Sequence, residues 1–238
     1  MNPKNRLREY VRSIPGWFTL PEAWLIYRKA RCVPNGQCIV ELGSFLGRST
    51  ACLIQGSMDG NGVPVYAVDP HTGSAEHTEA WGPVDTYAAF EGNLKQYGLW
   101  ENVTAIRATS LEAAMDSYPP IGLLFIDARH ELQFVTEDYR SWLPGMAKGG
   151  VVAFHDTVHH DCPGPALLTA HLLARSNVRT AGFAQTTTCL KVKIGYVGIS
   201  DRMENLLFLA YRSAISVPHW LRGLAFRIFR LKKRVDFN

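Results

Sequence analysis

Cysteine is scarce in this 238-residue chain and is not arranged in pairs. The five cysteines are an odd number and include no Cys-x-x-Cys motif, which argues against both a disulfide framework and a zinc site. The first twelve residues lack the apolar core of a signal peptide, and no hydrophobic run approaches the length of a membrane span. These absences favour a soluble protein of a reducing, cytoplasmic compartment.

Low-complexity linkers and internal repeats are absent as well, so no second independent domain is expected. With 47% hydrophobic and 19% charged residues, the chain can bury a full core. We predict a helical N-terminal cap over residues 1–35, with Thr19 as a helix N-cap, a central domain over residues 36–200, and a basic amphipathic helical tail over residues 201–238.

Positive charge is concentrated in the tail. From Arg202 to Asn238 there are eight basic and two acidic residues, a net charge of +6 against +4 for the whole chain, so the remainder is slightly acidic. A slightly acidic body argues against a nucleic-acid groove. Apolar residues at helical spacing over residues 203–238 could lie with the basic ones on an anionic membrane surface. The alternative is that the tail docks on the body or on a twin subunit, and we expect a homo-oligomer.

Strand and helix patterns alternate from residue 38 to residue 156, which predicts a mainly parallel sheet with helices on both faces. A further helix over 165–174 and two strands predict a C-terminal antiparallel hairpin. The expected strands lie near 38–42, 64–68, 103–107, 122–126, 150–154, 179–184 and 188–197, and the helices of the alternating part lie near 49–58, 85–97, 110–116 and 132–144.

Residues 39–50 combine an apolar strand, an acid, two glycines and the start of a helix. Gly43 and Gly47 permit a tight turn with close backbone approach. A dinucleotide site here would read G-x-G-x-x-G, but Phe45 replaces the middle glycine and Glu41 ends the strand. A carboxylate repels a pyrophosphate and suits a ligand with an ammonium or sulfonium group. The turn therefore favours S-adenosylmethionine as the ligand.

A second acid, Asp69, ends the next strand 28 positions after Glu41, which is the spacing of a βαβ unit. A carboxylate at this place suits the two hydroxyls of a ribose. Taken singly, Glu41 could cap a helix and Asp69 could form an ordinary turn before Pro70. Because both acids occur together at this spacing, ligand binding by Glu41 and Asp69 explains them better than two separate structural roles.

The motifs of residues 16–197 resemble the class I S-adenosylmethionine-dependent methyltransferases, in the branch of small O-methyltransferases that act on sugars and natural products, such as macrocin O-methyltransferase. The resemblance implies a Rossmann-like, doubly wound α/β fold with a seven-stranded sheet. It also implies donor contacts by Ser44, Ser49, Ser110 and Asp127 beside Glu41, Gly43 and Asp69, with Ser110 at the adenine. The motifs are Glu41-Leu42-Gly43-Ser44, Gly47-Arg48-Ser49, Val68-Asp69-Pro70, the helix over 86–98, Ile126-Asp127-Ala128-Arg129-His130, Lys148-Gly149-Gly150 and Phe154-His155-Asp156-Thr157.

Polar residues also follow the strands predicted near 122–126 and 150–154. Asp127 and Asp156 come at the carboxyl ends of predicted neighbouring strands, where they could hold Mg²⁺ against a substrate diol. By resemblance, the metal-dependent members of the family bind the ion with residues matching Asp127, His155 and Asp156. His155 stands where some relatives have an acid, and imidazole suits transition metals better than magnesium.

His130 is the predicted general base, because imidazole titrates near neutral pH and Arg129 replaces an acid that relatives often have at that position. Alternatives remain for each of these polar residues. His155 could serve as the base or form hydrogen bonds within the core, and Asp127 could cap the helix that starts near Glu131. The loop over 73–83 is expected to form one wall of the acceptor pocket.

Together these features predict an S-adenosylmethionine-dependent O-methyltransferase, assisted by magnesium, that methylates a hydroxyl of a sugar, a glycan or a glycosylated metabolite. One alternative is a metal-independent small-molecule O-methyltransferase with a histidine base. Another is a non-catalytic S-adenosylmethionine-binding module that its basic tail attaches to a membrane or a partner.

Overall fold

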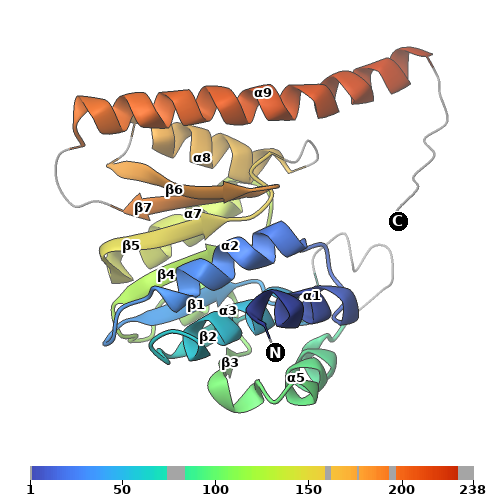
Figure 1. Cartoon of the computed structure of the whole chain (residues 1–238), viewed down its shortest axis with the longest axis vertical. Coiled ribbons are helices and arrows are strands. Elements are labelled where there is room, and N and C mark those ends of the chain that lie inside the picture. The colour runs from blue at the N-terminus through green and yellow to red at the C-terminus, as the bar shows by residue number, and fades with distance from the viewer. Residues whose placement is uncertain (1, 74–83, 159–161, 176, 193–196, 230–238) are drawn as a thin grey trace.

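The computed structural model describes residues 2–73, 84–158, 162–175, 177–192 and 197–229, with side chains up to Ala214 at the C-terminal end. Within these residues one sheet of seven strands runs through the molecule in the order β3-β2-β1-β4-β5-β7-β6 (Figure 1). The strands are β1 (Cys38–Leu42), β2 (Val65–Val68), β3 (Thr104–Ile106), β4 (Ile121–Ile126), β5 (Met146–Phe154), β6 (Val178–Ala184) and β7 (Thr187–Val192).

The sheet is parallel from β3 to β5, and β7 pairs antiparallel with both β5 and β6. The predicted mainly parallel seven-stranded sheet with a C-terminal hairpin is confirmed. From β1 the chain first builds outward to β3 and then returns to place β4 on the other side of β1. Sheets of this kind bind ligands at such a reversal, beyond the carboxyl ends of the strands.

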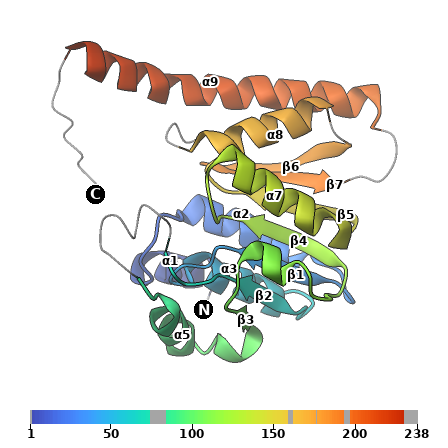
Figure 2. The same ribbon diagram turned by 180° about the vertical axis from the view of Figure 1, so that it is seen from behind.

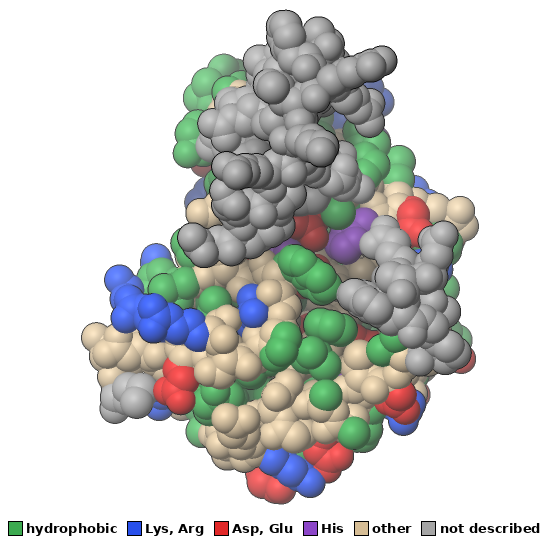
Figure 3. Space-filling view, turned by 90° about the vertical axis from the view of Figure 1, so that its right-hand side faces the viewer, with side chains coloured by type: hydrophobic (Ala, Val, Ile, Leu, Met, Phe, Trp, Pro, Cys, Tyr) green, Lys and Arg blue, Asp and Glu red, His purple; other side chains and the backbone are tan. Residues whose placement is uncertain are grey.

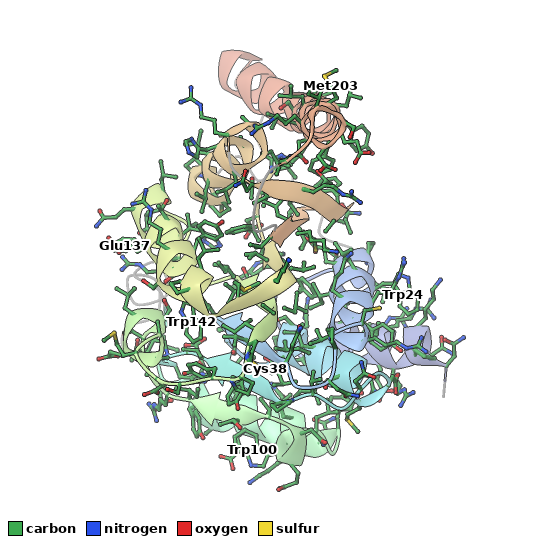
Figure 4. The ribbon with its side chains drawn as sticks, turned by 90° about the vertical axis from the view of Figure 1, so that its left-hand side faces the viewer. Trp24, Cys38, Trp100, Glu137, Trp142 and Met203 are labelled. Atoms are coloured by element: carbon green, nitrogen blue, oxygen red, sulfur yellow. The ribbon has the colours of Figure 1, made fainter. Side chains whose placement is uncertain are left out.

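The two faces of the sheet bury two separate cores, because successive residues of a strand point to opposite sides. Ile39 and Leu123 pack with helices on the face seen in Figure 1, whereas Val40 and Leu124 pack with those seen in Figure 2. In Figure 4, Trp24 and Trp142 lie on opposite faces. The first face carries α1 (Pro3–Ser13), α2 (Leu20–Arg31), α3 (Arg48–Met58) and α5 (Tyr87–Gln96), and the second carries α6 (Ser110–Ala113), α7 (Leu132–Trp142) and α8 (Pro163–Arg175).

Element boundaries differ from the sequence prediction mainly around two strands. β5 starts at Met146 rather than near residue 150, because an irregularity around Gly149, which has a φ of 77°, lets the strand pair with β4 on both sides of the glycine. α6 ends at Ala113, short of the predicted 116. The predicted strand over 188–197 is described as far as Val192, and residues 193–196 lie outside the described part.

The N-terminal cap is held on the sheet by close helix packing and by a buried acid. α2 begins with the predicted N-cap, Thr19, whose backbone N–H and hydroxyl both donate to Glu22 Oε2, at 2.9 and 2.6 Å. At the contact between α2 and α3, a Cβ on Gly56 would lie 2.5 Å from the backbone oxygen of Tyr27. Only glycine lets the two helices approach this closely, so the cap is fixed over the sheet.

The long C-terminal helix α9 (Ile199–Phe229) docks on the body through its first half (Figure 1). Asn205 is buried, donates to Val178 O at 2.8 Å and accepts from Thr180 N at 3.0 Å. Arg212 is also buried and donates to Thr169 and Ala166 of α8. For residues 199–214 the structure therefore favours docking on the body. Among the described residues, no helix has the length and hydropathy to cross a bilayer.

Candidate functional site

The residues that follow four parallel strands are held in line by backbone hydrogen bonds between neighbouring strand ends. Asp69 N donates to Ile106 O, Gly43 N to Val68 O, Asp127 N to Leu42 O and His155 N to Ile126 O, at 2.9 to 3.1 Å. Polar residues from separate parts of the chain are thereby brought to one edge of the sheet. In Figure 3, which views this edge, acidic and histidine side chains meet near the middle of the face.

The glycine turn between β1 and α3 has a backbone that other residues do not fit. Gly43 has a φ of 85°, and a Cβ there would lie 2.3 Å from the backbone oxygen of Asp127. Gly47 has a φ of 90° and precedes the first residue of α3. Phe45, which stands in place of the middle glycine of a dinucleotide motif, also has a positive φ, 46°. Strained backbone of this kind is characteristic of ligand sites.

Glu41 organises this turn from inside the protein. Its side chain is fully buried, and its carboxylate accepts hydrogen bonds from the hydroxyls of Ser44, Ser49 and Thr50, at 2.9, 2.6 and 2.5 Å. The acid therefore ties the start of the turn to the first turn of α3. Thr50 was not among the residues selected from the sequence. Direct contact of Glu41 with the donor stays a prediction.

The burial of Glu41 leads to a test of stability against pH. Burial raises the pKa of Glu41 from 4.5 to about 7, although its hydroxyl donors act in the opposite direction. The folded protein then holds a proton that the unfolded chain has lost, so ionising Glu41 lowers the free energy of unfolding as pH rises from 4.5 to 7. A shift of this size corresponds to ~3 kcal/mol.

We expect Glu41→Gln to gain stability relative to the natural protein by up to ~3 kcal/mol between pH 5 and pH 8, because glutamine does not titrate. Urea unfolding of both proteins over this pH range measures the difference. A stability difference that stays constant with pH would show that Glu41 is ionised throughout.

Asp69 binds the backbone of the same turn and remains partly exposed. Its Oδ2 accepts from the N–H groups of Ser44 and Phe45, both at 2.8 Å, and its Oδ1 accepts from His71 N at 2.7 Å. Carboxylate oxygens have capacity for further donors, such as ribose hydroxyls. Ser110 starts α6 after β3, and its hydroxyl donates to Asp138. The contacts of Asp69 with ribose and of Ser110 with adenine stay predictions.

A compact cluster of two acids and two histidines lies at the ends of β4 and β5. His155 Nδ1 is 3.1 Å from Asp127 Oδ1 and 3.0 Å from Asp156 Oδ2. His130 Nε2 is 3.2 Å from the same Asp156 oxygen and 4.0 Å from Asp127 Oδ1. The structure therefore brings together all four residues that the sequence analysis assigns to metal binding and proton transfer.

Among the described residues, His130 Nε2 and His155 Nδ1 have no partner in good hydrogen-bond geometry, although both atoms are buried and lie close to carboxylate oxygens. Asp156 also has a strained backbone, with a φ of 53°. Buried polar atoms are normally paired, so each exception needs an explanation. A cation between the carboxylates and the nitrogens would satisfy them all, and ligand sets of Asp127, His155 and Asp156, or of His130, Asp156 and Cys162, are close enough to share an ion.

The charges in the cluster are strongly coupled. The Asp156 carboxylate close to its Nε2 and the neighbouring Cys162 raise the pKa of His130 to about 10. Burial opposes charge on His155, but Asp127, Asp156 and Glu22 together raise its pKa well above the usual range. A protonated imidazole cannot accept a proton. His130 can therefore act as the predicted base only if another positive charge, such as a cation, displaces its proton.

Glu22 and Thr186 were missed by the sequence analysis. Glu22 is 1% exposed, and its Oε1 lies 3.3 Å from His155 Nε2. Thr186 donates to the same carboxylate oxygen at 2.6 Å from its hydroxyl and at 3.0 Å from its backbone N–H. The Thr19–Glu22 spacing marks a helix start, but no local pattern shows that this acid reaches a strand end more than 130 positions away.

One expectation about a helix cap and one about a loop can be compared with the structure. α7 begins at Leu132 with Glu131 in the cap position, so Asp127 does not cap that helix. His71, which precedes the predicted acceptor wall, is buried and bonded through Nδ1 to Thr86 Oγ1 at 2.9 Å. Residues 74–83 of that wall lie outside the described part of the chain.

Comparison with protein families and curated proteins agrees with this geometry. Residues 40–157 match the sequence model of a family described as a methyltransferase domain. The uncharacterized protein y4gI of Sinorhizobium fredii (strain NBRC 101917 / NGR234) is 33% identical over 121 residues, which is 50% of this chain and 13% of that protein. The chain thus matches only about an eighth of the length of that curated relative.

Solved structures show the same fold at low sequence identity. The O-methyltransferase TomG from Streptomyces achromogenes, involved in tomaymycin synthesis and solved with S-adenosylmethionine, has a TM-score of 0.56 at 17% identity, with 81% of this chain and 90% of that chain covered. An O-methyltransferase from Bacillus cereus with S-adenosylhomocysteine scores 0.56 at 17% identity, covering 79% and 91%. The S-adenosylhomocysteine-bound methyltransferase PaMTH1 of Podospora anserina scores 0.58 at 15% identity, covering 82% and 89%.

Proposed function

The chain carries a methyltransferase domain of the class I, S-adenosylmethionine-dependent type, and on that premise we propose that it methylates a hydroxyl of a sugar, a glycan or a glycosylated metabolite with the help of a divalent cation. The observation that carries the proposal is the position of the cluster. Asp127 and Asp156 follow β4 and β5, and Gly43 follows β1, beside the point where the strand order reverses. A donor on the glycine turn and an acceptor at the cluster would therefore be neighbours.

On the donor side, S-adenosylmethionine when bound supplies an electrophilic methyl group on a positively charged sulfur. Gly43 allows the turn to approach the ligand, and Glu41 fixes the turn through its three hydroxyl donors. Asp69 holds the backbone of Ser44 and Phe45 and offers remaining acceptor capacity to ribose hydroxyls. These residues orient the donor, and none of them needs to exchange a proton during the transfer.

On the acceptor side, a divalent cation when bound supplies Lewis acidity that makes a hydroxyl easier to deprotonate. Asp127, His155 and Asp156 would hold it, and magnesium is the ion that the sequence analysis predicts. His130, whose Nε2 is 3.2 Å from Asp156 Oδ2, would receive the hydroxyl proton once its own proton has been displaced. The carboxylates also hold the acceptor oxygen in a defined position.

The class of acceptor rests on two kinds of support. TomG and the Bacillus cereus protein are O-methyltransferases, which favours oxygen as the acceptor atom. The sugar comes from the resemblance of the sequence motifs to sugar O-methyltransferases. The metal-independent alternative is weaker for His130 and His155, because the acids around them favour the protonated form of both imidazoles. A homo-oligomer and a cytoplasmic location belong to the same proposal.

The test is transfer of a labelled methyl group from S-adenosylmethionine to a panel of free sugars, glycans, glycosylated metabolites and phenols, with and without EDTA. We expect transfer to a sugar hydroxyl, loss of transfer in EDTA and recovery with added divalent cation. Transfer only to phenols would overturn the acceptor class. Full activity in EDTA would overturn cation assistance, and donor binding without transfer to any compound would favour the non-catalytic alternative.

A further inference from the structure

The side chain of His155 is fixed from the N-terminal cap of the molecule and not only from its own strand. Its ring is 5% exposed and lies between the cluster on the Nδ1 side and Glu22 of α2 on the Nε2 side. Thr186, in the turn between β6 and β7, contacts Nε2 at 3.3 Å. Three parts of the chain that are distant in sequence therefore enclose one imidazole.

The hydrogen bonds around this ring determine which nitrogen carries the proton. The Thr186 hydroxyl has a single hydrogen, and its 2.6 Å bond to Glu22 Oε1 uses it, because Glu22 is surrounded by donors and can only accept. Toward His155 the hydroxyl must therefore accept, so Nε2 is protonated. In the neutral imidazole the lone pair is then on Nδ1, which faces Asp127 and Asp156.

A lone pair that faces two carboxylate oxygens at 3.0 and 3.1 Å is repelled unless a positive charge lies between them. Without a metal ion that charge is a proton on Nδ1, in keeping with the raised pKa of His155, and a bound metal ion takes the place of this proton. Donor atoms on adjacent positions around an octahedral ion with bonds of about 2.1 Å are themselves about 3.0 Å apart. His155 Nδ1 thus has the spacing of a neighbouring ligand from each of the two carboxylate oxygens. A metal-binding histidine typically donates its other N–H to a carboxylate or another acceptor, which is the arrangement that Thr186 and Glu22 provide.

We propose that Glu22 is a positioning residue that, with Thr186, holds His155 Nδ1 as a ligand for a first-row transition-metal ion. This inference rests on the proposed function only in placing a cation at the cluster, and it changes the expected ion from magnesium to one that accepts imidazole. Magnesium prefers oxygen ligands and gains little from a nitrogen, whereas cobalt and zinc gain much. The cap residues 1–35 then take part in selecting the metal, through α2.

The test compares Co²⁺ and Mg²⁺ binding to the full chain by titration calorimetry, together with the visible absorption of bound Co²⁺. Glu22→Gln is expected to weaken Co²⁺ binding about 10-fold or more, as for other residues that orient metal ligands. It should change Mg²⁺ binding by less than about threefold, because the two carboxylates remain. A purely structural defect would weaken both ions alike.

The chain contains a matched control. Thr109 and Glu112 form a second capping box in which the backbone N–H and the hydroxyl of Thr109 donate to Glu112 at 2.9 and 2.6 Å, the same distances as in the Thr19–Glu22 box, but without a histidine. Glu112→Gln should leave both affinities unchanged. If Glu22→Gln does not fold, Thr186→Val removes the hydroxyl that accepts from Nε2 and should give the same selective loss of Co²⁺ binding.

Equal losses for Co²⁺ and Mg²⁺, or no loss in Glu22→Gln, would overturn the proposal, as would a natural protein that does not bind Co²⁺ more tightly than Mg²⁺. These outcomes differ from failure of the proposed function. A protein with the expected Co²⁺ selectivity but no methyl transfer to any hydroxyl would keep this inference and lose the function. A protein that transfers methyl groups in EDTA and binds no Co²⁺ would lose this inference and cation assistance but keep the methyltransferase activity.

Discussion

Replacing Gly43 with alanine is expected to weaken donor binding and to slow methyl transfer by about 100-fold, the loss in rate that a misplacement of about 1 Å can cause. A Cβ at this position would lie 2.3 Å from the backbone oxygen of Asp127 and 2.7 Å from its carbonyl carbon. Both are backbone atoms that cannot rotate away. Either the turn or the end of β4 must therefore move, and with it the donor site or the metal cluster.

The control for this variant is Gly36→Ala. Gly36 has a similar φ, 79° against 85°, but no atom lies within 4 Å of the position that its Cβ would take. Both variants carry the cost of a left-handed backbone, roughly 1 kcal/mol, and only Gly43→Ala adds the clash. Binding of S-adenosylhomocysteine measured by calorimetry, with urea unfolding in parallel, separates the two effects. Equal donor affinities for Gly36→Ala and Gly43→Ala would show that the turn does not approach the ligand.

The fold and the edge of the sheet that carries the site could be predicted because both depend on local patterns. Buried strands appear as apolar runs, and an acid at the end of such a run is placed by the parallel sheet itself. Gly43, Asp69, Asp127 and His155 come together for this reason. The pairing of strand ends fixes their positions once the order of the strands is known.

The surroundings of the site could not be predicted, because they come from contacts between distant segments. Glu22 and Thr186 are 164 positions apart in the sequence, yet two partly buried hydrogen bonds join them beside His155. No spacing rule covers such a contact. The capping box explains why Glu22 is an acid on α2 but not why its other oxygen reaches the sheet.

The predicted role of His130 shows the same limitation in its chemistry. An isolated imidazole titrates near pH 6.5, which is the basis for choosing a histidine as the base. In the folded protein Asp156 lies 3.2 Å from His130 Nε2. This contact, together with the neighbouring Cys162, raises the pKa of His130 to about 10. A residue type predicts an intrinsic pKa, whereas the partners that shift it are set by the fold.

Replacing Asp156 with asparagine is expected to reduce metal binding at least 100-fold and methyl transfer by about 10³-fold, because loss of several kcal/mol of charge stabilisation corresponds to that factor in rate. Asp156 is the residue shared by both candidate ligand sets. Its φ of 53° is tolerated by asparagine, so the backbone should be kept and the change is confined to the charge.

The same substitution should also change the pKa of His130, which provides a measurement independent of activity. The contact with the Asp156 carboxylate is the largest cause of the raised pKa of His130, so in the metal-free variant this pKa should fall from about 10 toward its usual range. Titration of the histidine ring signals by NMR would detect the change. Asp59→Asn is the control. Asp59 follows the end of α3 and accepts hydrogen bonds from Tyr27 and Gln55, which do not belong to the cluster. If Asp156→Asn binds metal as the natural protein does, Asp156 holds His130 in place and is not a metal ligand.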